Sequence, residues 1–268
     1  MTIIEHEWFE IKKVKSYLYI IRERLDKIEP RFLTKYTNLY LIIGEEKALL
    51  IDTGSGLFPL KKIVQNLIKG KELIVINTHS DFDHIGGNYE FKEIFIHYKE
   101  KERITNPQDI SMLKTSQEES IDRFAANNFK LKAANKTTAI KNGHIFDLGN
   151  IKITCLYTPG HSIGSISLLS SENELFTGDL AHYGAIYLPE RKKHYEVIDS
   201  LEKLLRLYEK TPQINIYPSH EQFGVGIELL VDLKKAIKQI DKSWENRVWN
   251  EYLSSWIIQY QDFQFITN

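Results

Sequence analysis

The chain has 268 residues, of which 42% are hydrophobic, 12% aromatic and 26% charged, a composition typical of ordinary globular proteins. Its 35 Lys and Arg residues almost balance 36 Asp and Glu residues, so the bulk charge gives no reason to expect a nucleic-acid partner or an anionic membrane surface. The single cysteine, Cys155, excludes an internal disulfide framework and any Cys-rich zinc module, and it fits a reducing compartment.

The amino-terminal segment, MTIIEHEWFEIKKVK, is acidic and amphipathic, whereas a signal peptide needs a basic segment followed by an apolar run. No apolar stretch in the chain is long enough to span a bilayer. We therefore predict a cytoplasmic protein that is neither secreted nor inserted into a membrane.

The first predicted elements lie between residues 38 and 76. Residues 38–53 form a strand hairpin around the polar Gly-Glu-Glu-Lys turn. Pro59 then opens an amphipathic helix that ends near Gly70. The apolar run 73–76 is a buried strand, and it leads directly into a polar cluster at residues 78–87.

The second half of the chain repeats this order. Residues 165–169 and 175–177 are typical of strands, the spacing of apolar residues predicts a helix over 197–208, and residues 214–217 form another strand. The repeat indicates two similar ββαβ halves whose polar loops gather at one edge of a core. We favour one composite domain spanning residues 1–268 over two separate domains.

Two further segments fall outside this repeat. Residues 98–142 are charged and polar, and we expect a helical insertion there. Residues 222–268 form an aromatic-rich tail that we predict to be helical, with an amphipathic helix over 227–240. The tail aromatics need a partner surface: packing on the domain's own core is favoured, and a dimer interface or a substrate-pocket wall are the alternatives.

The strongest chemical signal is the loop after the strand at 73–76, which holds His79, Asp81, Asp83 and His84. Two imidazoles and two carboxylates in one loop can wrap a cation. In an extended segment the alternating residues 79, 81 and 83 would share one side while His84 points elsewhere, which suits two neighbouring ions. Gly86-Gly87 would then let the backbone approach the site closely.

Three further residues follow predicted strands: His161 in Thr-Pro-Gly-His, Asp179 in Thr-Gly-Asp and His220 in Pro-Ser-His. Any one of them alone would ordinarily be a turn or capping residue. The four motifs taken in order, over residues 38–221, resemble the metallo-β-lactamase superfamily. The resemblance implies an α/β fold, a four-layer αβ/βα sandwich, with a metal site at one edge.

The resemblance also implies a role for each residue. His79, Asp81 and His161 hold a first metal ion, Asp83, His84 and His220 hold a second, and Asp179 bridges the two. We expect Asp83 and Asp179 to be the ligands that take part in catalysis. Asp52, in Ile-Asp-Thr-Gly, resembles a buried aspartate of the family that orients a ligand from behind.

One position departs from the common family pattern, which has His where this chain has Asp81. The expected cofactors are two divalent ions. Zinc is the first choice, and iron or manganese are alternatives because a carboxylate is a harder ligand than imidazole. Carboxylates at this position resemble the flavodiiron proteins, which use Glu, and the phosphorylcholine esterases, which use Asp.

His182 and Tyr183 follow Asp179 closely and are candidates to bind a substrate oxygen, although packing is the usual role of such residues. Cys155 lies inside an apolar strand, where we expect a small buried hydrophobe outside the site.

These features predict a binuclear metallohydrolase in which a hydroxide bridging the metals attacks a small ester-like substrate, namely a thioester, a lactone or a phosphodiester. The alternatives are a non-haem di-iron redox protein and a metal-binding member of the fold without turnover. The expected partner is a small-molecule substrate, without nucleic acid or membrane, and a homodimer is left open.

Overall fold

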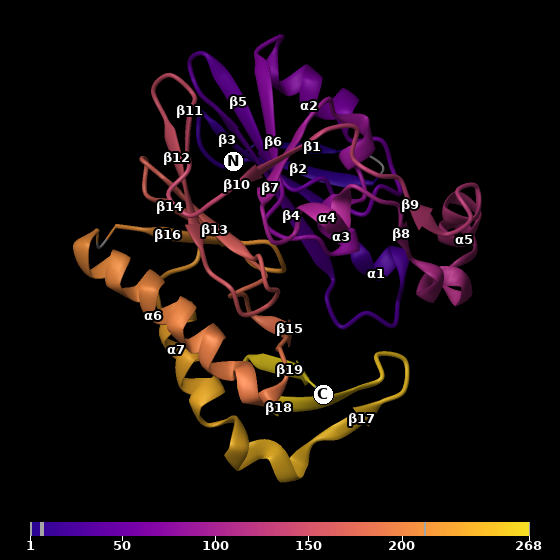
Figure 1. Ribbon diagram of the computed structural model, residues 1–268, viewed down its shortest axis with the longest axis vertical. Coiled ribbons are helices and arrows are strands. Elements are labelled where there is room, and N and C mark those ends of the chain that lie inside the picture. The colour runs from indigo at the N-terminus through magenta and orange to yellow at the C-terminus, as the bar shows by residue number, and fades with distance from the viewer. Residues whose placement is uncertain (1, 6–7, 212, 268) are drawn as a thin grey trace. The chain divides into compact units, whose positions relative to one another are not determined.

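The computed structural model describes residues 2–5, 8–211 and 213–267 (Figure 1). The chain divides into two compact units, residues 1–153 and 154–268. This division does not test the single composite domain, which stays a prediction. Among the described residues, none of the helices combines the length and the apolar character that crossing a bilayer requires.

The first unit is built on an eight-stranded sheet of order β1-β2-β3-β4-β5-β6-β7-β10. Its strands are β1 (Thr2–Glu5), β2 (Phe9–Lys13), β3 (Leu18–Arg24), β4 (Tyr36–Ile43), β5 (Lys47–Ile51), β6 (Glu72–Ile76), β7 (Ile94–His97) and β10 (Thr137–Ile140). Neighbours from β1 to β5 pair antiparallel, and those from β5 to β10 pair parallel. The predicted hairpin at 38–53 is confirmed as β4 and β5.

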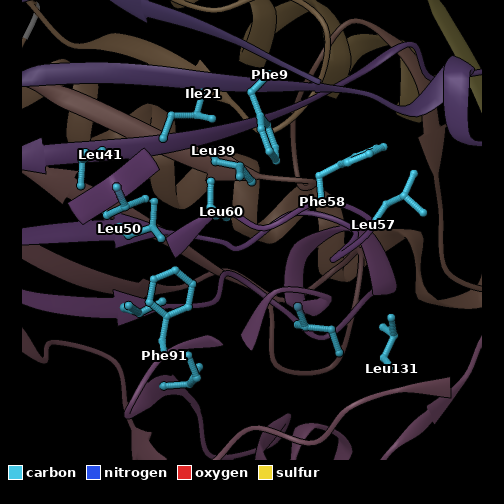
Figure 2. Close-up of a cluster of buried hydrophobic side chains, with 14 of the residues drawn as sticks. Phe9, Ile21, Leu39, Leu41, Leu50, Leu57, Phe58, Leu60, Phe91 and Leu131 are labelled. Atoms are coloured by element: carbon cyan, nitrogen blue, oxygen red, sulfur yellow. The ribbon is translucent and has the colours of Figure 1, made fainter. Parts of the chain in front are cut away.

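Helix α2 (Lys61–Ile68) shares an apolar core with this sheet. Figure 2 shows part of that core, with Ile21, Leu39 and Leu50 among the labelled side chains. The core takes alternate residues of β3, β4 and β5, including Ile21, Leu39 and Leu50, because successive side chains of a strand point to opposite faces. From α2 it takes Val64 and Ile68, which lie one turn apart. The helix ends at Lys69, whose φ of 51° is left-handed, as the Gly70 stop signal predicted.

The second unit contains most of a five-stranded sheet of order β11-β12-β13-β14-β16, and the boundary between the units falls within β12. These strands are β11 (Ile145–Asp147), β12 (Lys152–Tyr157), β13 (Ile166–Ser170), β14 (Glu174–Gly178) and β16 (Asn215–Pro218). Helices α6 (His194–Lys210) and α7 (Glu228–Lys238) share one apolar core with β14 and β16. The strands and helices predicted between residues 165 and 240 are thereby confirmed.

The aromatic tail differs from its prediction. It is helical in α7 and η4 (Ile240–Asn246), but its last residues form β17 (Val248–Asn250), β18 (Ser255–Tyr260) and β19 (Phe263–Thr267). These strands join β15 (Gly184–Tyr187) in a sheet of order β15-β19-β18-β17. The aromatic and β-branched residues of β19, in the sequence Phe-Gln-Phe-Ile-Thr, favour a strand, and the helical prediction overlooked this preference. Phe263 and Phe265 pack in the core of the second unit. This agrees with the favoured prediction that the tail aromatics pack on the protein's own core.

The insertion at 98–142 is also only partly helical. It contains α4 (Lys101–Ile104), η2 (Ser111–Thr115) and α5 (Glu118–Ala125), but also a two-stranded sheet of β8 (Gln108–Asp109) and β9 (Lys130–Leu131), and it ends in β10. β10 is an edge strand of the main sheet, paired parallel with β7. The prediction of a helical insertion holds for its middle and is wrong for β10, since the β-branched Thr137 and Thr138 favour a strand.

We expect Phe265→Ala to destabilise the protein by about 3–5 kcal/mol, because the fully buried ring would leave a cavity in the core of the second unit. Chemical denaturation followed by tryptophan fluorescence measures the effect. Gln264→Ala, on the same strand but half-exposed, is the control and should change the free energy of unfolding by less than about 0.5 kcal/mol. Equal effects of the two substitutions would mean that the tail does not belong to the core.

Candidate metal centre

The first group of candidate ligands lies where two parallel strands of the first sheet end. β5 and β6 pair in parallel register, with Ile51 opposite Ile76. Asp52 follows β5 directly, and the segment that carries His79 follows β6. Because parallel strands end at the same edge of a sheet, the buried side chains of Asp52 and His79 are brought together.

The local conformation of this loop differs from the extended segment expected. Asp81 is extended, but Asp83 and His84 lie in the one-turn helix α3 (Phe82–Ile85). The backbone N–H of His84 donates to the carbonyl of Asp81 at 3.0 Å, which closes the turn. A helical turn after an extended residue brings residues 79, 81, 83 and 84 together without strict alternation.

The donor atoms of this loop form two pairs. Nε2 of His79 lies 3.7 Å from Oδ2 of Asp81, and Nε2 of His84 lies 3.4 Å from Oδ2 of Asp83. Two ligands of one tetrahedral ion at about 2.0–2.2 Å are themselves roughly 3.3–3.6 Å apart. The spacing and the nitrogen and oxygen chemistry of both pairs therefore fit a divalent metal, while the division of the ligands between a first and a second ion stays a prediction.

Asp52 orients both histidines. Its carboxylate accepts hydrogen bonds from N and Oγ1 of Thr78, both at 2.8 Å, and Oδ2 lies 2.9 Å from Nδ1 of His84. Thr78 Oγ1 is also 3.0 Å from Nδ1 of His79. A carboxylate against Nδ1 fixes the tautomer of His84 and directs Nε2 away, toward Asp83. The contacts of Asp52 are those expected of a residue that supports ligands from behind.

Close backbone packing holds the loop in place. A Cβ on Gly86 would lie 2.0 Å from the carbonyl of Ser55, and one on Gly87 would lie 2.5 Å from the carbonyl of Thr53. Both glycines have room only for hydrogen, which confirms the predicted close approach of the backbone. Gly86 N also donates to the carbonyl of Gly54 at 2.8 Å, so the ligand loop is tied to the segment that follows Asp52.

Several supporting residues carried no sequence signal. The carbonyl of His84 accepts from Thr53 N at 2.8 Å and from Nδ2 of Asn77 at 2.9 Å. Oδ2 of Asp83 accepts from Oγ1 of Thr37 at 2.9 Å. The only signal for Asn77 and Thr53 in the sequence is that they flank the motifs. Thr37 lies in a distant strand, and only the fold brings it near Asp83.

Glu23 is a further buried group behind the site. Its carboxylate accepts from N and Oγ of Ser55 at 2.8 and 2.7 Å. Burial raises the pKa of Glu23 to about 7, and the nearby charge of Asp83 raises it further, while the Ser55 hydrogen bonds act in the opposite direction. Negative charge accumulates in this part of the first unit.

The second group of candidate ligands lies in the second unit, around one carboxylate. Nε2 of His220 is 2.9 Å from Oδ2 of Asp179, and Nε2 of His161 is 3.9 Å from the same oxygen. β14 and β16 pair in parallel, so the residues after them, Asp179 and the Ser219-His220 segment, meet at one edge. The structure therefore brings His161, Asp179 and His220 together, while the bridging role of Asp179 stays a prediction.

His161 is positioned by contacts with α6. Gly160 has a φ of 148°, and a Cβ there would lie 2.9 Å from Cα of Val197. Ser200 Oγ donates to the carbonyl of Pro159 at 2.5 Å. The Thr-Pro-Gly-His turn is therefore pressed against the helix, and glycine is required for its close approach and its positive φ.

His182 and Tyr183 lie beside this group. The His182 ring is 5.0 Å from the His220 ring, and burial lowers the pKa of His182 to about 3, so its imidazole is neutral. Its Nδ1 is 2.9 Å from the carbonyl of Tyr183 and must carry the proton, which makes Nε2 an acceptor. Tyr183 stacks on Phe263 with the ring centres 5.6 Å apart. Substrate binding by the two residues stays a prediction.

Cys155 is fully buried in β12, and burial raises the pKa of its thiol to about 12. A thiol with so high a pKa is not a nucleophile near neutral pH. Its predicted role as a small buried hydrophobe agrees with this position.

Comparison with known proteins identifies the family of this chain. The family model described as the metallo-beta-lactamase superfamily matches residues 34–220. The human acyl-coenzyme A thioesterase MBLAC2 is 27% identical over 233 residues, covering 80% of this chain and 81% of that protein. A probable metallo-hydrolase of Methanocaldococcus jannaschii is 32% identical over 195 residues, covering 70% of this chain and 89% of that protein.

Solved structures show the same fold at lower identity. A metallo-beta-lactamase from Pontibacter korlensis superposes with a TM-score of 0.59 at 17% identity, covering 86% of this chain and 99% of that chain. The family match and the named relatives define a hydrolytic enzyme, and the histidines and carboxylates described above are its candidate metal ligands. The chain belongs to the metallo-β-lactamase superfamily, so the predicted family, fold class and hydrolytic enzyme class are confirmed.

Replacing Asp52 by Asn should weaken metal binding about 10- to 100-fold, because the carboxylate that orients His79 and His84 loses its charge while its shape is kept. Competition with a fluorescent chelator measures the affinity. Asp122→Asn removes an exposed carboxylate of α5 and should leave the affinity unchanged. Unaltered affinity in the Asp52 variant would refute its orienting role.

Gly86→Ala should destabilise the protein by at least about 1–3 kcal/mol and lower its metal content, since the added methyl group meets the Ser55 backbone. Thermal unfolding and elemental analysis test both effects. The matched control is Gly226→Ala, where the added carbon meets only the end of the flexible Glu228 side chain. If both variants keep full stability and metal content, the close packing is not needed for the site.

Proposed function

We propose that the chain hydrolyses thioesters of the acyl-coenzyme A type with the help of two divalent metal ions. The observation that carries the proposal is the pairing of imidazole and carboxylate donors in each unit, in the family's order. The family match at residues 34–220 includes both groups. The thioesterase name of the human relative, which aligns with 80% of this chain, supports the substrate class.

In this proposal His79, Asp81 and His161 hold one ion, Asp83, His84 and His220 hold the other, and Asp179 binds both. Divalent cations in such a site polarise a carbonyl oxygen and lower the pKa of water, which is the chemistry that thioester hydrolysis needs. Zinc fits the donors, and iron or manganese are also compatible with the carboxylate of Asp81.

The protein's own side chains hold the reacting groups in place. Thr37 donates a hydrogen bond to Oδ2 of Asp83 and so restricts rotation of the Asp83 carboxylate. The neutral His182 ring next to His220 adds no positive charge that would repel a metal ion. Asp83 and Asp179 are thus proposed as the catalytic carboxylates.

One alternative function is a di-iron redox protein, which the carboxylate of Asp81 favours. The other alternative is a member of the fold that binds metal without turning over a substrate. A small-molecule substrate and a cytoplasmic location remain part of the proposal, and a homodimer remains open.

The metal-loaded protein should hydrolyse a medium-chain acyl-CoA and lose the activity on treatment with a chelator, with recovery on adding Zn²⁺. His84→Ala and Asp179→Asn should each lower kcat/KM by at least about 100-fold, because each removes a ligand. Release of free thiol, measured with a chromogenic thiol reagent, is the assay. Cys155→Ser is the control, since the buried thiol has no part in the reaction, and it should keep most of the activity.

Oxygen consumption by an iron-loaded protein without thiol release would support the redox alternative instead. Metal binding without turnover of a thioester, a lactone or a phosphodiester would support the third class. Either result would overturn the proposed thioesterase function.

A further inference from the structure

Ser80, which lies between the candidate ligands His79 and Asp81, is held by two side chains from the insertion. Its hydroxyl group donates a hydrogen bond to Oε2 of Glu100. Its carbonyl accepts a hydrogen bond from Nε2 of Gln108 at 3.3 Å. Ser80 and Glu100 are both fully buried, and Gln108 is half-buried. The residue between the two ligands is therefore tied to the insertion through its side chain and through its backbone.

The strand order explains how Glu100 reaches the ligand loop. β6 and β7 pair in parallel, with Ile76 opposite Phe95, and the N–H of Asn77 donates to the carbonyl of Phe95 at 2.9 Å. Because parallel strands end at the same edge of a sheet, the turn after β7 lies beside the loop after β6. Glu100 belongs to that turn, and its N–H donates to the carbonyl of His97, the last residue of β7, at 2.9 Å.

Further hydrogen bonds fix the two side chains that hold Ser80. Glu100 directly precedes α4, and its carbonyl accepts from the N–H of Arg103 at 3.1 Å. The amide group of Gln108 also donates to the carbonyl of Arg103 at 3.0 Å, so its two N–H groups can serve both carbonyls. Burying a carboxylate costs free energy that an apolar side chain of similar size would not, so hydrogen bonding is what glutamate contributes at this position.

Asp81 is the ligand that gains most from this support. Its side chain is 40% exposed, whereas the side chain of Asp83 is 10% exposed and accepts from Thr37. His84 is held by Asp52. The position of Asp81 therefore depends more strongly on the backbone next to it. Since metal ligands must be held within roughly 0.5 Å of their working positions, a fixed Ser80 is what such a ligand needs.

We propose that Glu100 and Gln108 are positioning residues for the donor pair His79 and Asp81, and that they act on this pair through Ser80. This inference rests on the proposed function, since it takes these donors to hold a metal ion. It gives the insertion a part in the metal centre. The other donor pair of the same loop is supported from the sheet instead, so loss of the Ser80 contacts should affect one ion much more than the other.

The first test measures metal affinity and does not depend on activity. Competition with a fluorescent chelator gives the binding constants of the full chain for successive zinc ions. Glu100→Ala and Ser80→Ala should each weaken one constant about 10- to 100-fold, the effect of groups that hold metal ligands, and leave the other unchanged. Glu100→Gln should lose less, because its amide oxygen still accepts from Ser80. Glu102→Gln, at an exposed position of α4, is the matched control and should equal the wild type.

The double variant Glu100→Ala, Ser80→Ala separates positioning from general destabilisation. Because one hydrogen bond can be removed only once, the double variant should bind the weakened ion no worse than the single variants do. The visible absorption of the Co²⁺-loaded protein, which reports the geometry around the ion, should shift in these three variants and return toward the wild-type spectrum in Glu100→Gln. Thermal unfolding checks that each variant folds. If Glu100→Ala does not fold, Ser80→Ala, which removes a single oxygen atom, provides the test.

Losses that add up in the double variant, equal losses for both ions, or affinities equal to that of the wild type would overturn the inference. Absence of metal binding by the wild type would do the same. These outcomes are independent of the substrate. A wild type that binds metal and shows the selective loss, but hydrolyses no thioester, would overturn the proposed function and support this inference.

Discussion

The candidate metal centre depends on the carboxylate of Asp52 at the end of β5. It contacts His84 directly and His79 through Thr78, so one buried charge sets the orientation of an imidazole in each donor pair. This is possible because β5 and β6 are parallel neighbours, whose ends bring residues 52 and 77–79 to one place. Antiparallel pairing would send the two segments to opposite edges. The strand order is therefore as necessary to the site as the ligands are.

Backbone contacts explain how the ligand loop keeps its shape. Hydrogen bonds join Thr53 N to the carbonyl of His84 and Gly86 N to the carbonyl of Gly54. They require the two segments to lie closer than any side chain allows, so glycine is needed at Gly86. Side-chain chemistry at this site thus relies on main-chain packing beneath it.

The motifs and the main elements could be predicted from the sequence because each has a local cause. The hairpin at 38–53 and the helices at α2, α6 and α7 follow from periodicity. Other features depend on distant partners. Thr37 contacts Asp83 across 46 residues, and β19 pairs in parallel with β15, far away in the chain. The tail was wrongly expected to be wholly helical because its aromatic residues suit either structure until a neighbouring strand is known.

The charge of the first unit's site favours a bound cation. Asp52, Asp83 and Glu23 are buried within a short stretch of structure, and the pKa of Glu23 is raised to about 7 by that burial. Buried carboxylates are costly unless opposite charge is near. A divalent ion beside Asp83 would offset this cost and lower the pKa of Glu23. Since the ion binds only the folded arrangement of these residues, metal binding and the stability of the first unit are linked.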